Sequence, residues 1–201
     1  MFANLASLSL VTLLLAATPL LAQEPHTDDP EPGPAQKLLD MGQPVNAGPE
    51  LGERYSKAKH GDWDLTCINT EAEVDPCSLE QILRDDEGFA VAVMSLFRLK
   101  EGGQAVAGAT MLVPLETLLT ARVTISIDGG PGKQYNYSFC SSEGCIAQIG
   151  LTQADVDAYK RGNMATITIV PARSPDEVIS LPMSLTGFTA GYKVVDVVAN
   201  R

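Results

Sequence analysis

Apolar and polar residues alternate with a period of two along much of the chain, and this period is typical of half-buried β-strands. The clearest example is 123–127 (VTISI), which is followed by a glycine-rich turn at 129–132 and by renewed alternation at 135–139 (YNYSF). These three segments predict a β-hairpin. The segment 90–99 is apolar on both faces, as in a central strand that is covered on two sides.

Further short strands are predicted by the same kind of pattern, with turn-forming residues between them. They comprise 62–67, 77–83, 106–113, 145–149, 165–170, 178–185 and 193–198. Many short strands separated by turns are typical of an all-β protein in which two sheets pack on each other. The sequence therefore predicts a two-sheet β-sandwich.

One short helix is predicted near residues 152–161. Thr152 is a suitable N-cap, and Asp155 three positions later completes a capping box in which Asp replaces the usual Glu. Lys160 and Arg161 lie in the last turn, where positive charge interacts favourably with the helix dipole. Gly162 follows at a position where glycine commonly ends a helix.

The first 22 residues have the features of an export signal. The segment from Leu5 to Ala22 carries no charge, and the small Ala22 is followed by polar residues, as at a cleavage site. The usual basic residues before the apolar segment are missing, because the first Lys or Arg is Lys37. The uncharged run approaches the roughly 18 residues that suggest a spanning helix. A cleaved signal peptide at 1–22 is favoured, and a retained anchor is the alternative.

Residues 23–59 have the composition of an acidic linker. Six prolines break regular structure there, and the acidic residues within 28–31 keep the segment solvated. We therefore expect a largely disordered linker, followed by one globular domain at 60–201. At roughly 140 residues this domain can bury about two thirds of its unfolded surface, which is enough for a single core.

The charge of the chain excludes some partners. It has 25 acidic and 14 basic residues, which gives a formal net charge of -11. Nucleic acids and anionic membrane surfaces attract clustered Lys and Arg, so neither is an expected partner. Contact with a membrane is expected only through an uncleaved leader.

Four cysteines occur as two close pairs, Cys67 with Cys77 and Cys140 with Cys145. In an exported protein such cysteines are expected to form structural disulfides. Four cysteines allow three connectivities, and we favour Cys67–Cys77 and Cys140–Cys145 because thiols close in sequence meet more often during folding. Each small loop contributes about 2–3 kcal/mol in the loop-entropy model, and crossed pairs would contribute more, so stability does not decide the connectivity.

The spacing of the cysteines disfavours other uses of thiols. Structural zinc sites place two to four residues between paired ligands. Four residues separate Cys140 from Cys145, which fits, but nine separate Cys67 from Cys77, which does not. A thiol redox motif needs Cys-x-x-Cys, which neither pair has. The acidic clusters at 71–75 and 85–87 lack the order of a calcium-binding loop and are explained by a solvated surface. We expect no metal and no cofactor.

Few residues are suited to acid–base or nucleophilic catalysis. His26 lies in the predicted linker, which leaves His60 as the candidate general base, with Asp62 and Asp64 as nearby carboxylates. The Gly-x-Ser-x-Gly pattern of a hydrolase is absent, and 132–134 (GKQ) departs from a phosphate-binding loop. We expect no enzyme. An unrecognised enzyme is the alternative, and it requires a cleft in which His60 hydrogen-bonds a carboxylate.

Five motifs, in order along the chain, resemble the invasion-associated locus B family of exported bacterial proteins. They are Gly61-Asp62-Trp63 before Cys67, Cys77-Ser-Leu-Glu-Gln81, the strand at 123–129, Cys140-Ser-Ser-Glu-Gly-Cys145 and 184–190 (SLTGFTA). The resemblance covers about residues 61–195. It implies a periplasmic or surface-associated protein with a β-sandwich domain. The four cysteines carry over from the family, and no catalytic residue does.

A stapled scaffold without a catalytic constellation favours a binding function. We expect an exported, non-enzymatic module of the bacterial cell envelope whose partner is an envelope protein or a host-surface protein. The resemblance adds a role in host-cell entry to this expectation. A structural envelope protein without a ligand is the alternative. An exposed apolar patch or an open edge strand would favour a protein partner, whereas a deep polar pocket would favour a small ligand.

Overall fold

The computed structural model describes residues 40, 42, 48–100 and 103–198. The chain divides into two units, Met1–Asn46 and Ala47–Arg201. In the first unit only Asp40 and Gly42 are described, and the Gly42 amide donates to the Asp40 carboxylate (2.8 Å). The predicted signal peptide and most of the predicted linker lie outside the described residues. All helices and strands below belong to the second unit.

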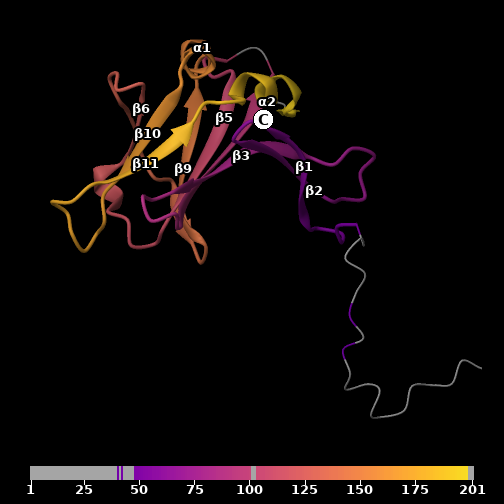
Figure 1. Ribbon diagram of the computed structural model, residues 1–201, viewed down its shortest axis with the longest axis horizontal. Coiled ribbons are helices and arrows are strands. Elements are labelled where there is room, and N and C mark those ends of the chain that lie inside the picture. Colours follow the sequence, from indigo (N-terminus) through magenta and orange to yellow (C-terminus); the bar gives the residue numbers. More distant parts are fainter. Residues whose placement is uncertain (1–39, 41, 43–47, 101–102, 199–201) are drawn as a thin grey trace, which may run out of the picture. The chain divides into compact units, whose positions relative to one another are not determined.

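The described strands form two sheets (Figure 1). The large sheet has the order β1-β2-β3-β4-β5-β9-β8, and β12 pairs in parallel with the end of β4. Its strands are β1 Arg54–His60, β2 Trp63–Ile68, β3 Cys77–Arg84, β4 Ala90–Leu99, β5 Ala107–Val113, β8 Phe139–Ser141, β9 Gly144–Leu151 and β12 Val197–Val198. The small antiparallel sheet has the order β11-β10-β6-β7. Its strands are β6 Val123–Ile127, β7 Lys133–Tyr135, β10 Met164–Ile169 and β11 Ile179–Ser184.

Three helical segments connect these strands: η2 (Leu119–Ala121), α1 (Gln153–Arg161) and α2 (Phe188–Val194). The predicted capping box is present at the start of α1, because the side chains of Thr152 and Asp155 each accept from the other residue's backbone amide. Within the described ranges, no helix is long and apolar enough to cross a membrane.

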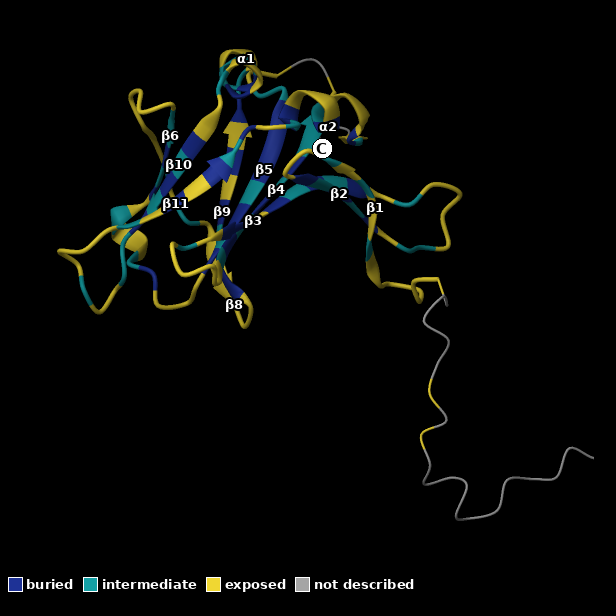
Figure 2. Cartoon of the chain, viewed as in Figure 1, coloured by how far each residue is buried: buried dark blue, intermediate teal, exposed yellow. Residues whose placement is uncertain are grey.

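The core lies between the two sheets and under α2. In Figure 2 the buried positions run along the strands, and most exposed positions lie in the connections. Leu79, Met94 and Met111 from the large sheet and Ile167 from the small sheet are fully buried. Phe188 of α2 closes one end of this core, where its ring makes edge contacts with Trp63 and Tyr159, each with ring centroids 5.4 Å apart. Burial of these apolar side chains is the main term that stabilises the sandwich.

The predicted fold class, a two-sheet all-β sandwich with a short helix near 152–161 and two disulfides, is confirmed. The predicted strand 90–99 coincides with β4. The structure adds a second helix, α2, where the sequence predicts a strand at 193–198. Gly191 of α2 packs so closely on the Leu79 side chain that a Cβ there would collide with it. The helix is thus in close contact with a strand that is distant in sequence, and only β12 remains of the predicted strand.

The predicted hairpin at 123–139 is also different. β7 pairs with β6 as expected, but it ends at Tyr135, and the chain then crosses to the large sheet, where β8 pairs with β9. Tyr137, in the crossing segment, is half-buried and packs against the core. The apolar/polar alternation therefore continues where the chain passes from one sheet to the other, so the sequence pattern does not reveal the crossing.

The predicted linker extends too far. Residues 54–60 form β1, which pairs antiparallel with β2 along its length. The register shifts between Ser56 and Ala58, and this irregularity interrupts the period of two. Most side chains of β1 are exposed because it is an edge strand, so its composition resembles that of a linker.

Candidate functional site on the open face of the large sheet

Both cysteine pairs join neighbouring strands of the large sheet. Cys67 and Cys77 are register partners on β2 and β3, and Cys140 and Cys145 are register partners on β8 and β9. Each pair forms a disulfide with the two Cα atoms 4.0 Å apart. These are the pairs that the short separations favoured. The disulfides hold the register near opposite ends of the strand order.

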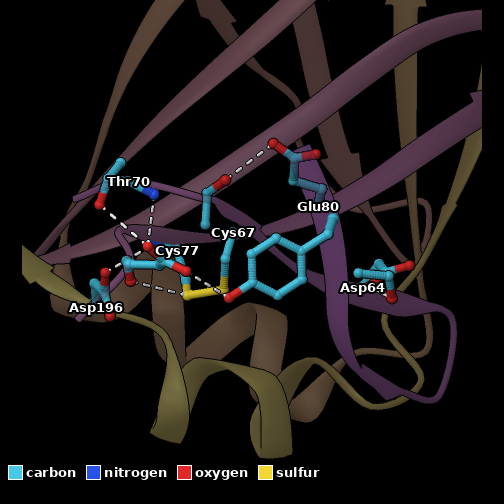
Figure 3. The surroundings of a disulfide bond; sticks show 10 residues. Asp64, Cys67, Thr70, Cys77, Glu80 and Asp196 are labelled. Atoms are coloured by element: carbon cyan, nitrogen blue, oxygen red, sulfur yellow. Dashed lines mark hydrogen bonds between the residues drawn. A yellow bond between two sulfur atoms is a disulfide. The ribbon is translucent and has the colours of Figure 1, made fainter. Parts of the chain in front are cut away.

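The loop between Cys67 and Cys77 is closed by a carboxylate. Asp75 accepts hydrogen bonds from the Thr70 amide (2.8 Å) and from the Tyr55 hydroxyl (2.8 Å). These donors, the Thr70 amide foremost, lower the pKa of Asp75. Figure 3 shows Thr70 and Asp196 beside the disulfide. Asp196 accepts from the Cys77 amide (2.6 Å) and so ties the C-terminal segment to β3.

The outer face of the large sheet carries a row of apolar side chains. The register places Ile82 opposite Val93, Val93 opposite Leu112, Leu112 opposite Ile146, and Ile146 opposite Phe139. We call these five residues the apolar row. It crosses β3, β4, β5, β9 and β8. Ile82 and Phe139 at its ends are 53% and 51% exposed.

The apolar row has no second layer over it within the described chain, because all five of its side chains are half-buried or exposed. The opposite face differs, since its positions on the same strands are buried against the small sheet and α2. The two faces of one sheet thus differ in what covers them. A contiguous apolar strip left open on a folded domain is typical of a protein interaction surface.

A polar row runs beside the apolar row on the same face. Register pairs place Asp64, Glu80, Ser95, Thr110 and Gln148 side by side. Glu80 accepts from the Ser95 hydroxyl (3.0 Å) and also pairs with Arg54. Glu80 and Ser95 are thus held by their hydrogen bond to each other. The open face therefore has one apolar and one polar stripe.

An open hollow of about 890 Å³ adjoins the apolar row, because Ile82 also lines it. Six carboxylates line this hollow, against two basic side chains, Lys59 and Arg84. The carboxylates belong to Asp62, Asp64, Glu80, Asp85, Asp86 and Glu87. Its charge is therefore complementary to a basic group.

Three of the sequence motifs meet at one corner between the sheets. Gln81 of β3 is buried, and its amide nitrogen donates to the carbonyl oxygens of Asp62 (3.2 Å) and Ser184 (3.0 Å). Its amide oxygen accepts from the Ser184 backbone (2.8 Å). The indole of Trp63 donates to the same Ser184 carbonyl (2.9 Å). These contacts explain why Gly-Asp-Trp, Gln81 and the C-terminal motif occur together.

Two glycines of these motifs make the corner tight. Gly61 and Gly187 both have positive φ, at 60° and 87°. A Cβ on Gly187 would overlap the His60 carbonyl oxygen, and a Cβ on Gly61 would lie 2.5 Å from the Thr186 carbonyl oxygen. Only glycine combines this backbone conformation with so close an approach. The motifs therefore specify the scaffold.

The structure does not assemble the acid–base pair that the enzyme alternative requires. The Nε2 atom of His60 is buried and has no hydrogen-bond partner among the described residues. Asp62 instead accepts from the Ser184 hydroxyl (2.5 Å), and Asp64 accepts from the Ser56 hydroxyl (2.5 Å). In the described part of the chain, no group of three or more potential metal ligands is present.

A sequence model described as invasion associated locus B protein matches residues 63–196, which is more than half of the chain. The chain belongs to this family. The resemblance inferred from the motifs is thereby confirmed. The match spans both disulfides and the corner formed by Trp63, Gln81 and Ser184.

Relatives and a solved structure agree with this membership. Invasion protein B homologs from Brucella abortus strain 2308 and from biovar 1 strain 9-941 are each 25% identical to the chain over 129 residues. Each alignment covers 64% of this chain and 72% of the relative. The crystal structure of invasion associated protein B from Bartonella henselae has a TM-score of 0.57 at 22% identity. It covers 68% of this chain and 91% of that chain, and the likeness concerns the fold.

The sequence reasoning found the cysteines and the corner motifs but missed the apolar row. Because segment 90–99 is apolar on both faces, the sequence predicts a strand that is covered on two sides. The structure covers one side, so Val93 belongs to an open surface. Ile82 alternates with the buried Gln81 and Leu83, but this burial is a property of the folded sheet and is not visible in the sequence.

Proposed function

We propose that the chain is an exported, non-enzymatic binding module of the bacterial cell envelope, and that it docks a protein partner on the apolar row. The apolar row is the observation that carries the proposal. Its five side chains come from five strands, and they form a continuous strip only in the folded sheet. A rigid sheet presents such a strip without ordering cost, which favours binding.

The edge strands of both sheets are poorly suited to docking, which favours the open face of the large sheet as the docking surface. β1 carries Lys57 and Lys59 and a register shift, and β11 carries Pro182. β7 and β8 are three residues long. Charged residues, irregularities, proline and short length all oppose the addition of a further strand. Docking by strand addition is therefore disfavoured.

The cellular location in this proposal is the periplasm or the cell surface. The apolar leader predicted at 1–22 supports it, and so do the two disulfides, which form and persist in oxidising compartments. The relatives are named invasion protein B homologs. We extend this name to the present chain only as a proposal that the partner lies in the envelope or on a host-cell surface.

The charge beside the apolar row suggests the chemistry of the partner. Asp86 and Glu87 in the acidic hollow are exposed, and no hydrogen bond or ion pair of their side chains is found in the described chain. A partner segment with apolar residues and flanking Lys or Arg would satisfy both surfaces. Such a complex should associate more slowly at high salt, because exposed charges mainly steer encounter.

Affinity capture with matched variants tests the proposal. The mature chain is immobilised and exposed to envelope extracts and to host-membrane extracts, and captured proteins are identified. The variant Ile82→Ser/Phe139→Ser removes both exposed ends of the row. The control Val74→Ser/Val178→Ser removes two apolar side chains that are 69% and 65% exposed in loops.

We expect a protein that the wild type and the control retain and that the row variant loses. At about 1 kcal/mol for each truncated end of the row, the double variant should weaken binding by roughly 30-fold. Equal retention by both variants would contradict docking on the row. Capture of nothing from either extract would favour the alternative of a structural envelope protein without a ligand.

A further inference from the structure

A second concave site lies between α1 and the β6–β7 hairpin. It has a volume of about 390 Å³. Ile125, Ile127 and Ala158 supply aliphatic wall, and the rings of Tyr135 and Tyr159 also line it. None of its lining residues belongs to the strands that carry the apolar row. The site is therefore independent of the proposed docking surface, and its size is that of a small-ligand pocket.

The two carboxylates of this pocket are already occupied by donors. Asp155 pairs with Lys133 and accepts from the amide (3.0 Å) and hydroxyl (2.7 Å) of Thr152. Asp128 accepts from the backbone amides that follow α1, at Asn163 (3.1 Å) and Met164 (3.0 Å). These carboxylates build the pocket walls and have little capacity left for a ligand.

The pocket side chains with unused hydrogen-bond capacity include three that can donate, Tyr159, Arg161 and Lys133. Tyr159 is 2% exposed, and its hydroxyl has no partner among the described residues. Burial, and then the nearby Tyr135 and Asp155, raise the pKa of Tyr159, so the phenol stays a neutral donor. Arg161 lines the pocket without a partner in the described chain, and Lys133 uses one of three donors on Asp155.

We propose that this pocket binds a small organic acid, with a compact apolar body against Ile125, Ile127 and the tyrosine rings and a carboxylate that accepts from the unused donors. Aliphatic and aromatic walls select the apolar body. Two cations and a buried phenol favour an anionic acceptor, because a carboxylate forms stronger hydrogen bonds with them than an uncharged acceptor does, and a cationic group would leave these donors unpaired. Arg161 is the charged contact that has no hydrogen-bond or ion-pair partner in the described chain.

Isothermal titration and NMR shift mapping on the full mature chain test this site. The probes are benzoate, 4-hydroxybenzoate, cyclohexanecarboxylate and hexanoate, each up to its solubility limit, with benzamide as the uncharged match of benzoate. We expect at least one acid to bind at a single site with shifts confined to α1 and β6–β7. Benzamide should bind about tenfold more weakly, because it lacks the charge that strengthens the hydrogen bonds.

Three variants separate a binding role from a structural one. Tyr159→Phe and Arg161→Gln should each weaken the acid about five- to tenfold, the loss expected for one good hydrogen bond. Tyr159→Phe should unfold at the same or a higher denaturant concentration than the wild type, because the lost hydroxyl has no partner. Lys57→Gln, an equal loss of charge on β1, should leave affinity unchanged.

The proposal is overturned if none of the four acids binds, or if benzamide binds as tightly as benzoate. It is also overturned if both pocket variants keep the affinity of the wild type. A loss of stability in Tyr159→Phe would show that the hydroxyl has a structural partner and would remove the main argument for the pocket. None of these outcomes bears on docking at the apolar row.

Discussion

Replacing Gln81 by Leu tests whether hydrogen bonds hold the corner that joins the two sheets. The side chain makes three such bonds, two donated to the carbonyls of Asp62 and Ser184 and one accepted from the Ser184 amide. Each contributes about 0.5–1.5 kcal/mol net, and a buried amide left without its acceptor costs about 1–3 kcal/mol. Leu has a similar volume, so little cavity is added. We expect a loss of about 2–4 kcal/mol in the free energy of unfolding.

Urea denaturation measures this loss as a lower midpoint at unchanged slope. Gln148→Leu, on the exposed face of β9, is the matched control and should change the free energy by less than about 0.5 kcal/mol. A loss for Gln81→Leu no larger than that of the control would refute the reasoning. It would mean that the corner is held without the Gln81 hydrogen bonds, by the packing of Trp63 and Phe188 and by the hydrogen bond from the Trp63 indole to Ser184.

A second substitution at the same position, Gln81→Glu, tests the same hydrogen bonds through the pH dependence of stability. In Gln81→Glu, one carboxyl oxygen faces two carbonyl oxygens, and only the protonated form restores a donor. The pKa of the introduced carboxyl should therefore lie above its usual range in the folded protein. Its favourable contribution is present below the unfolded pKa of about 4.3 and is lost as pH rises through the folded pKa. The variant should thus be closer to the wild type in stability at acid pH than at neutral pH.

Two further predictions concern the disulfides and the loop beside one of them. As the reductant concentration rises, the Cys140–Cys145 disulfide should be reduced before Cys67–Cys77, because Cys140 is exposed whereas Cys67 and Cys77 are buried. Alkylation and peptide mapping measure the order of reduction. The reverse order would contradict the prediction. Asp75→Asn should be less stable than the wild type at neutral pH. Because the folded pKa of Asp75 is lowered, the wild-type advantage is present above the unfolded value and should decrease as pH falls below about 4. Urea midpoints over a pH series measure it, and a constant advantage would contradict the cause.

The fold could be predicted where local signals agree with the final structure. Strand 90–99 and the capped helix after Thr152 are determined by short-range pattern and by side chains that bond to their own backbone. Helix α2 could not be predicted in this way, because Gly191 is placed against Leu79, which is distant in sequence. The same holds for β1, whose exposed edge position makes its composition resemble a linker.

The candidate sites also include residues that the sequence reveals and residues that it does not. The cysteine pairs and the corner motifs are visible in the sequence, because a disulfide needs cysteine and a positive φ in close contact needs glycine. The apolar row is not visible, because it needs only apolar residues at positions that register brings together across five strands. The unpartnered Tyr159 hydroxyl is equally hidden, since burial without a partner is a property of the folded chain.

The contrast between the corner and the apolar row also suggests how such a domain can acquire different partners. The corner is intolerant of substitution, because Gly187 meets the His60 carbonyl and Gln81 makes three bonds in a buried site. The exposed ends of the apolar row, Ile82 and Phe139, make no such specific contacts, so they can change in size or charge at little cost to folding. A scaffold that is fixed at its corner and variable on its open face keeps the fold while its partner changes. Family membership therefore transfers the sandwich to this chain, whereas the partner in the proposed docking depends on the side chains of the apolar row.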